Sequence, residues 1–185
     1  MKIERSFYLR PALDVVKEFL GKRLVYNSEK GKVSGIISDV EAYPAFVDEI
    51  SHGNKRTPRT EVLYKEGGYA YVYLIYGLYH QFAVVVNKKD IPDVVFIRAV
   101  IPDEGIEIMR ENFGKAITKV SDLTKSPGNL CKSFGITLSL YGEDLTGDKL
   151  YLEDTGNLYS TIKSAKRVGI NSKLKGNKNP YRYFL

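Results

Sequence analysis

GGYAYVYLIYGLYH, residues 67–80, contains five of the chain's 14 tyrosines within one run of β-branched and aromatic residues. Such residues on both sides of a glycine are typical of two strands joined by a tight turn, because glycine tolerates the backbone angles that the turn needs. We therefore predict a β-hairpin that turns at Gly77 and carries Tyr76 near its tip. An aromatic side chain there has little core to enter. Tyr76 is then either an isolated exposed residue or a wedge that enters another molecule.

Outward from this hairpin, the residue pattern predicts further strands and helices. Apolar runs bounded by turn residues predict strands at 24–26, 33–43, 82–86 and 94–100, the first two forming a second hairpin. Helical spacing predicts helices at 11–20 and 103–112 and a third that begins at Pro127 after the cap Ser126. The polar, charged and turn-forming residues at 44–65 indicate an ordered surface loop. From Tyr141 onward, short apolar runs (150–152, 159–162, 168–170) alternate with turns.

Strands that come in hairpins, with helices at the ends and between them, favour an α+β fold. We expect a curved, mainly antiparallel sheet flanked by helices, with the tyrosine-rich hairpin protruding from it. At 185 residues and 43% hydrophobic, the chain is long enough for a proper core and has no composition break. Residues 1–185 are therefore expected to form a single domain.

The composition limits which kinds of partner and which cellular compartment we expect for this chain. Lys and Arg total 28 against 22 Asp and Glu, and the net charge of +6 suits a polyanion such as nucleic acid. Cys131 is the chain's one cysteine, so we expect a buried core thiol and no intramolecular disulfide. The charged N-terminus and the lack of a long apolar stretch predict a soluble, intracellular protein with no membrane partner.

The loop after the second hairpin has a basic edge, with Lys55, Arg56 and Arg59 set around Thr57. Aromatic residues near a basic loop are what a protein needs to stack on extruded bases while its cations hold the phosphates. This combination favours nucleic acid over other partners.

Three residues are candidates for chemistry. Glu41 ends an apolar strand and is either a solvated strand-end residue or a general base. His52 follows eleven residues later, and a lone histidine is more often structural than catalytic. Arg98 interrupts an apolar strand and needs a partner: it either forms a buried ion pair or orients a carboxylate or an attacking water.

Other kinds of site find no support in the sequence. Two histidines 28 residues apart and one distant cysteine make a poor zinc site, and no phosphate-loop lysine or nucleophile motif is found. We expect no metal and no cofactor.

A set of short motifs resembles the alkyladenine (3-methylpurine) DNA glycosylase family. Each motif is weak alone, but they follow the family's order along nearly the whole chain. The motifs are VEAY (40–43) with His52, TPR (57–59), YVYLIYG (71–77), IRAVIP (97–102), EGIEIMR (104–110), SPGNLC (126–131), DLTGD (144–148), RVG (167–169) and PYRYF (180–184).

The resemblance implies a monofunctional enzyme of base-excision repair that flips alkylated or deaminated purines from duplex DNA and hydrolyses the N-glycosidic bond. It makes Glu41 the general base that activates a water, with Arg98 and the Val168 backbone holding that water. The residues implied in binding the extruded base are Tyr43 on one face, His52 and Tyr73 on the other, and position 83. Those implied in binding DNA are Tyr76, Gly77 and Leu78 at the hairpin tip and Lys55, Arg56, Thr57 and Arg59 in the basic loop.

Such chemistry suits these residue types. Cleavage passes through an oxocarbenium-like transition state, so one carboxylate near C1′ can both stabilise positive charge and activate water. A cationic alkylated purine is already a good leaving group and stacks well on aromatic rings.

Two positions depart from the family's pattern. Ala83 stands where the family usually has an asparagine that excludes guanine, which predicts a pocket more tolerant of purines with an exocyclic N2 amine. Asn129 stands where the family has a basic residue, so one phosphate contact is expected to be lost.

The resemblance further implies a monomer that acts on double-stranded DNA containing damaged purines. It would work in the cytoplasm at the nucleoid if the source is prokaryotic, and in the nucleus if it is eukaryotic. Two other functions fit the composition: a nucleic-acid or lesion-binding protein without chemistry, and a basic structural or ribosome-associated domain.

Overall fold

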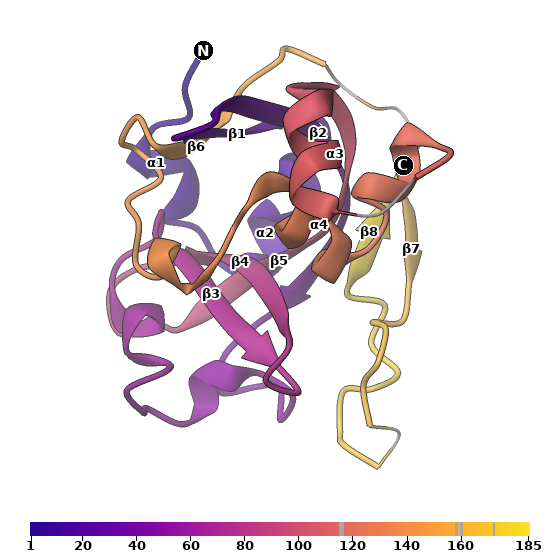
Figure 1. Ribbon diagram of the computed structural model, residues 1–185. Coiled ribbons are helices and arrows are strands. Elements are labelled where there is room, and N and C mark those ends of the chain that lie inside the picture. Colours follow the sequence, from indigo (N-terminus) through magenta and orange to yellow (C-terminus); the bar gives the residue numbers. More distant parts are fainter. Residues whose placement is uncertain (115–116, 158, 160, 172) are drawn as a thin grey trace.

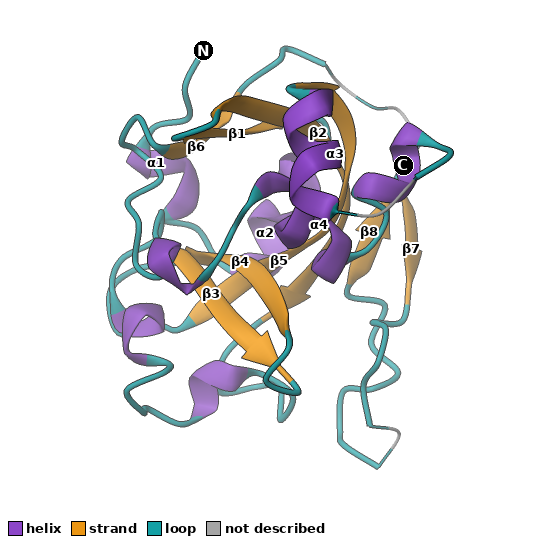
Figure 2. Ribbon diagram, viewed as in Figure 1, coloured by secondary structure: helices purple, strands orange, loops and turns teal. Residues whose placement is uncertain are grey.

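The computed structural model describes residues 1–114, 117–157, 159, 161–171 and 173–185. Within these residues, eight strands form one sheet in which every pairing is antiparallel (Figures 1 and 2). The main path runs β3-β4-β5-β2-β1-β6, and β8 pairs with both β2 and β7. The strands are β1 (Arg23–Ser28), β2 (Gly31–Tyr43), β3 (Ala70–Ile75), β4 (Tyr79–Val86), β5 (Asp93–Glu104), β6 (Leu150–Glu153), β7 (Lys163–Ala165) and β8 (Arg182–Phe184).

The α-helices described are α1 (Arg5–Tyr8), α2 (Ala12–Val15), α3 (Ile106–Phe113) and α4 (Pro127–Phe134). Short 3₁₀ turns lie at η1 (Val16–Phe19), η2 (His52–Asn54), η3 (Glu61–Tyr64), η4 (Val120–Leu123) and η5 (Leu138–Leu140). Helices therefore flank an antiparallel sheet, and the α+β fold class is confirmed. In the described part of the chain, no helix has the length and apolarity to cross a membrane.

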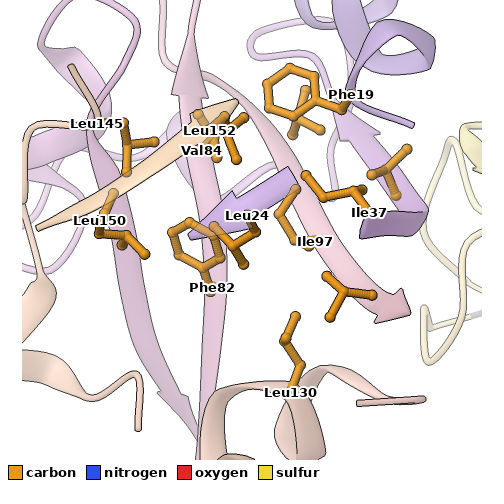
Figure 3. Close-up of a cluster of buried hydrophobic side chains, with 14 of the residues drawn as sticks. Phe19, Leu24, Ile37, Phe82, Val84, Ile97, Leu130, Leu145, Leu150 and Leu152 are labelled. Atoms are coloured by element: carbon orange, nitrogen blue, oxygen red, sulfur yellow. The ribbon is translucent and has the colours of Figure 1, made fainter. Parts of the chain in front are cut away.

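The sheet separates two groups of buried side chains, because successive residues of a strand point to opposite faces. On β4, Phe82, Val84 and Val86 enter the main core, whereas Ala83 and Val85 enter a second, smaller cluster. Figure 3 shows the main core, in which side chains from the sheet meet others from the helices. The second cluster lies on the face where the functional residues gather.

The alternation of side chains between the two faces of the sheet shifts partway along β2. Ile37 points into the main core, but the next core residues are Val40 and Ala42 rather than residue 39. The pairing of β2 with β5 is irregular on both sides of Asp39. An extra residue shifts the alternation by one, so this β-bulge turns Glu41 toward the second cluster instead of the main core.

The predicted tyrosine-rich hairpin is present as β3 and β4 and protrudes from the body (Figure 1). Its turn closes with a hydrogen bond of 3.1 Å from the Leu78 N–H to the Ile75 carbonyl. Tyr76 and Gly77 both have positive φ angles, 52° and 66°. An aromatic residue rarely adopts this left-handed conformation. The side chain of Tyr76 projects to 89% exposure, so it contributes almost nothing to the core.

Two predicted helices have other bounds in the structure. The segment 11–20 is not one helix but α2 followed by the 3₁₀ turn η1. The helix expected at 103–112 begins only at Ile106, because β5 continues to Glu104 and Gly105 turns the chain with a φ of 77°.

The remaining predictions are largely confirmed. The hairpin of β1 and β2, the strand near 150–152, the cap at Ser126 and the buried thiol of Cys131 are all present. The run 168–170 lies in a loop, and the run 159–162 includes residue 160, which is outside the described residues.

Candidate active site

Glu41 lies near the end of β2 with its carboxylate buried among three donors. Its exposed fraction is 0%. The Tyr43 hydroxyl donates to Oε2 at 2.8 Å, and the Val168 backbone N–H donates to Oε1 at 2.9 Å. Nη1 of Arg98 lies 3.1 Å from Oε1. Glu41 is therefore not a solvated strand-end residue, and Arg98 has the carboxylate partner that its position required.

The surroundings of Glu41 act on its proton affinity in opposite directions. Burial raises the pKa of Glu41 because the ionised form loses solvation, while the contacts with Arg98, Val168 and Tyr43 lower it. Burial also raises the pKa of Tyr43, so its hydroxyl keeps the proton that it donates to Glu41. The net effect is a raised pKa for Glu41, which makes its carboxylate a stronger base than an exposed one.

Asp39 links this carboxylate to the last strand of the sheet. Nε of Arg182 donates to both Asp39 oxygens at 3.0 and 3.2 Å, and Nη2 donates to Oδ2 at 2.7 Å. Nε of Arg98 lies 3.5 Å from the same Oδ2. The charges thus alternate from Arg182 through Asp39 and Arg98 to Glu41. This row restricts the rotation of Arg98 and keeps its Nη1 on Glu41.

A cavity of about 540 Å³ lies against these groups, within the usual size range of small-molecule sites. Tyr43, Arg98 and Val168 contact Glu41 and also line the cavity. Glu41 therefore stands directly behind the cavity wall.

One side of the cavity is an aromatic cluster. The rings of Tyr71 and Tyr73 stack with centroids 4.7 Å apart, and the His52 ring meets Tyr73 edge-on at 5.0 Å. Nδ1 of His52 lies 3.1 Å from the Tyr71 hydroxyl. Loss of solvation among the neighbouring side chains lowers the pKa of His52, and the nearby Arg59 lowers it further, which favours the neutral imidazole.

Tyr43 belongs to a different group of side chains. Its ring meets Phe96 edge-on at 6.4 Å, and the Arg167 guanidinium lies 4.6 Å from its centroid. Tyr43, His52 and Tyr73 all line the cavity. The cavity thus has aromatic walls of separate origin, one from β2 and one from β3 with η2.

The loop that presents the Val168 N–H is held by a buried ion pair. Arg167 donates through Nη1 to the Asp48 carboxylate and to the Ala42 carbonyl, the latter at 3.0 Å. Nη2 donates to the Gly176 carbonyl at 3.2 Å. Both side chains of the pair are 1% exposed. Residue 168 is therefore placed by a charge pair that joins two distant loops.

The hairpin contributes two more residues to the same cavity. Tyr76 from the turn and Ala83 from β4 both line it. Ala83 is 1% exposed and pairs with Tyr71 and Phe96 on the neighbouring strands. The cavity therefore collects all the residues expected to hold a base.

The model of the methylpurine-DNA glycosylase family matches residues 6–185 of this chain. The chain belongs to that family. The resemblance expected from the short motifs is confirmed, and the protein is a DNA glycosylase of base-excision repair.

Full-length bacterial relatives agree with the family match. A protein of Desulfitobacterium hafniense (strain Y51) is 41% identical over 100% of this chain and 95% of its own length. A protein of Clostridium acetobutylicum is 42% identical over 100% of this chain and 94% of its own length. A third, from Natranaerobius thermophilus, is 45% identical over 92% of this chain and 88% of its own length. All three carry the name of 3-methyladenine DNA glycosylases.

The basic loop of this glycosylase contributes unevenly to the site. Arg59 lines the cavity. Arg56 instead donates to both carboxylate oxygens of Glu61, at 2.9 and 2.5 Å. Thr57 is engaged with Thr60 in local hydrogen bonds. Lys55 is exposed. The roles expected for these residues in DNA binding remain predictions, and so do those of Gly77 and Leu78 at the hairpin tip.

Sequence reasoning missed several residues that build the site. Tyr71 lies in the YVYLIYG motif without an expected role, yet it lines the cavity and contacts His52. Asp39 and Asp48 belong to none of the quoted motifs, and Arg182 lies in PYRYF without an expected role. The RVG motif contains Arg167, and an arginine directly before the residue whose backbone is expected to hold the water was the signal that could have identified it.

Proposed function

We propose that this glycosylase flips alkylated purines out of duplex DNA into the aromatic cavity and hydrolyses the N-glycosidic bond with a water activated by Glu41. The observation that carries the proposal is the buried Glu41 carboxylate, held by three donors directly behind the cavity wall. All of residues 1–185 would act as one catalytic domain, as a monomer.

The carboxylate keeps one acceptor site for a water. An ionised carboxylate has about four lone-pair sites, and the Tyr43, Arg98 and Val168 contacts use three of them. A water at the remaining site would lose a proton to Glu41 as its oxygen attacks C1′. Electrons of the breaking C1′–N bond leave with the base, and the deoxyribose ends with a hydroxyl at C1′. The negative charge of Glu41 also stabilises the oxocarbenium-like transition state.

The cavity walls favour a flat, electron-poor base. Tyr43 would cover one face of the extruded purine, and Tyr73 with neutral His52 would cover the other. A cationic alkylated purine gains cation–π attraction there and is already a good leaving group. Stacking depends on the π-face as well as on charge, so the proposal extends to deaminated purines.

No lyase step is included. Strand cleavage through a Schiff base needs an amine nucleophile, and the residues described along the cavity wall include no lysine. The expected product is therefore an intact strand with an abasic site. Because the full-length relatives are bacterial, we place the enzyme in the cytoplasm, at the nucleoid.

The test measures the free base released from methylated duplex DNA by the purified protein. Release of 3-methyladenine with no strand break before alkali treatment is the expected result. Lesion binding without release would instead favour a non-catalytic recognition protein. Absence of both would favour a structural role.

Replacing Tyr76 with serine is expected to weaken flipping. The side chain is exposed at the hairpin tip and lines the cavity, so it can fill the space that an extruded base leaves. We expect base release at subsaturating enzyme to fall by about 10-fold or more, because unstacking costs a few kcal/mol that the wedge partly offsets. The comparison is with Tyr159→Ser, another partly exposed tyrosine. Equal activity of both variants would contradict the wedge role.

Replacing Ala83 with asparagine is expected to narrow the range of substrates. Ala83 lines the cavity, so the longer amide side chain would meet the exocyclic N2 amine of a guanine. We expect excision of 7-methylguanine to fall about 10-fold or more relative to 3-methyladenine, which is the size of a typical pocket discrimination. Both excision rates are measured on wild type and variant. An unchanged ratio would refute this role of position 83.

A further inference from the structure

The net positive charge of this protein comes from its C-terminal end. Residues 155–185 hold seven of the 28 Lys and Arg and none of the 22 Asp and Glu. This segment therefore carries +7, while the first 154 residues, with 21 basic and 22 acidic residues, carry −1. The net charge that suits a polyanion thus comes from the last strands and the loop between them.

Three of the seven charges already have acidic partners. Arg167 pairs with Asp48, and Arg182 pairs with Asp39. Lys175 lies 3.9 Å from Glu49. The other four, Lys163, Lys166, Lys173 and Lys178, are exposed, and the described part of the chain places no carboxylate within 4.0 Å of them.

Three of these four lysines lie between β7 and β8. We call the described residues of this stretch, 166–171 and 173–178, the lysine loop. Its backbone is tied to the body through Arg167, whose guanidinium holds the Ala42 and Gly176 carbonyls, and through the Lys175 N–H, which donates to Glu49 at 3.1 Å. Because Arg167, Lys175 and Gly176 are held in this way, the lysines beside them would lose less conformational freedom when they bind a partner.

The lysine loop and the tyrosine-rich hairpin both contribute residues to the wall of one cavity. Val168, Gly169 and Ile170 line it from the loop side, and Tyr76 lines it from the hairpin turn. In Figure 1 the chain between β7 and β8 extends well beyond the body, toward the side to which the tip of the β3–β4 hairpin also points. A long partner that enters the cavity at one nucleotide would therefore pass along the lysine loop.

We propose that the lysine loop binds the phosphodiester backbone of duplex DNA beside the extruded nucleotide. This inference rests on the proposed function, which places that nucleotide in the cavity. Lysine ammonium groups suit phosphates, because they bind as point charges and release condensed counterions. The basic loop at 55–59 is a weaker candidate for this role, since Arg56 is already paired with Glu61.

The test compares two double variants that each remove two exposed positive charges. Lys173→Gln/Lys178→Gln alters the lysine loop. Lys88→Gln/Lys89→Gln is the matched control, because these residues follow the far end of β4, whose eight residues span roughly 26 Å from the hairpin turn. Binding of an undamaged, fluorescently labelled duplex is measured between low and high salt, and thermal melting verifies that each variant is folded.

We expect the slope of log Kd against log salt to fall by about two in the lysine-loop variant, close to one per lost phosphate contact. The Kd at 0.1 M salt should rise about 10- to 60-fold, while the control keeps the wild-type slope. Equal slopes in the two variants would overturn the proposal. Since the DNA is undamaged, this result does not depend on catalysis, and failure of base release by the wild type would refute the proposed function separately.

Discussion

Replacing Glu41 with glutamine should abolish the release of alkylated purines while binding to the lesion survives. The amide keeps the size of the carboxylate but cannot accept a proton from water, and it lacks the charge that faces the oxocarbenium-like transition state. General-base catalysis alone contributes about 10²- to 10⁴-fold, so we expect the single-turnover rate constant to fall by at least about 10³-fold. Release of free base from methylated duplex measures the rate, and a gel-shift titration measures binding.

The control for this variant is Glu29→Gln, which removes an exposed carboxylate from the turn between β1 and β2. It should release base at the wild-type rate. The wild-type rate should also fall as the pH drops through the raised pKa of Glu41, because the protonated carboxyl cannot act as a base. Wild-type activity in Glu41→Gln would refute the assignment.

Replacing Asp48 with alanine should destabilise the fold strongly. Asp48 is the acidic partner of Arg167, both side chains are 1% exposed, and its removal leaves a buried guanidinium without a counter-charge. Removing one partner of a buried ion pair lowers the free energy of unfolding by about 3–5 kcal/mol. We expect the free energy of unfolding from urea denaturation to fall by about that amount. Activity of the remaining folded protein should fall too, since Arg167 precedes the Val168 N–H that contacts Glu41.

The matched control breaks an exposed ion pair. Nζ of Lys30 lies 2.6 Å from Oε1 of Glu111, but the two side chains are 49% and 67% exposed. Glu111→Ala should therefore change the free energy of unfolding by less than about 1 kcal/mol. If Asp48→Ala had no larger effect than this control, the buried pair would not be a structural anchor.

Local patterns predicted those elements whose cause is local. The β3–β4 hairpin follows from β-branched and aromatic residues around Gly77, and α4 follows from its cap at Ser126 and the proline after it. The predicted start of the helix at 103–112 was wrong because β2 pairs with β5 as far as Glu104. This long-range pairing overrides the local helical spacing.

The candidate site was only partly visible in the sequence. The motifs named Glu41, Arg98 and the Val168 region, but strand alternation alone could not tell which face Glu41 takes. That face depends on the β-bulge at Asp39, which arises from the register of β2 against β5. Arg182 could not be assigned either, because it meets Asp39 across 143 residues of sequence.

The sequence by itself determined the family, the α+β class and the protruding tyrosine-rich hairpin, because these depend on residue order and on contacts between near neighbours. Only the tertiary structure decided that Glu41 is buried behind an aromatic cavity and that two ion pairs tie the β7–β8 region to β2 and the loop after it. It also decided that residues 168–170 line the same cavity as Tyr76 of the hairpin. Each of these depends on segments far apart in the chain that meet only when the sheet assembles.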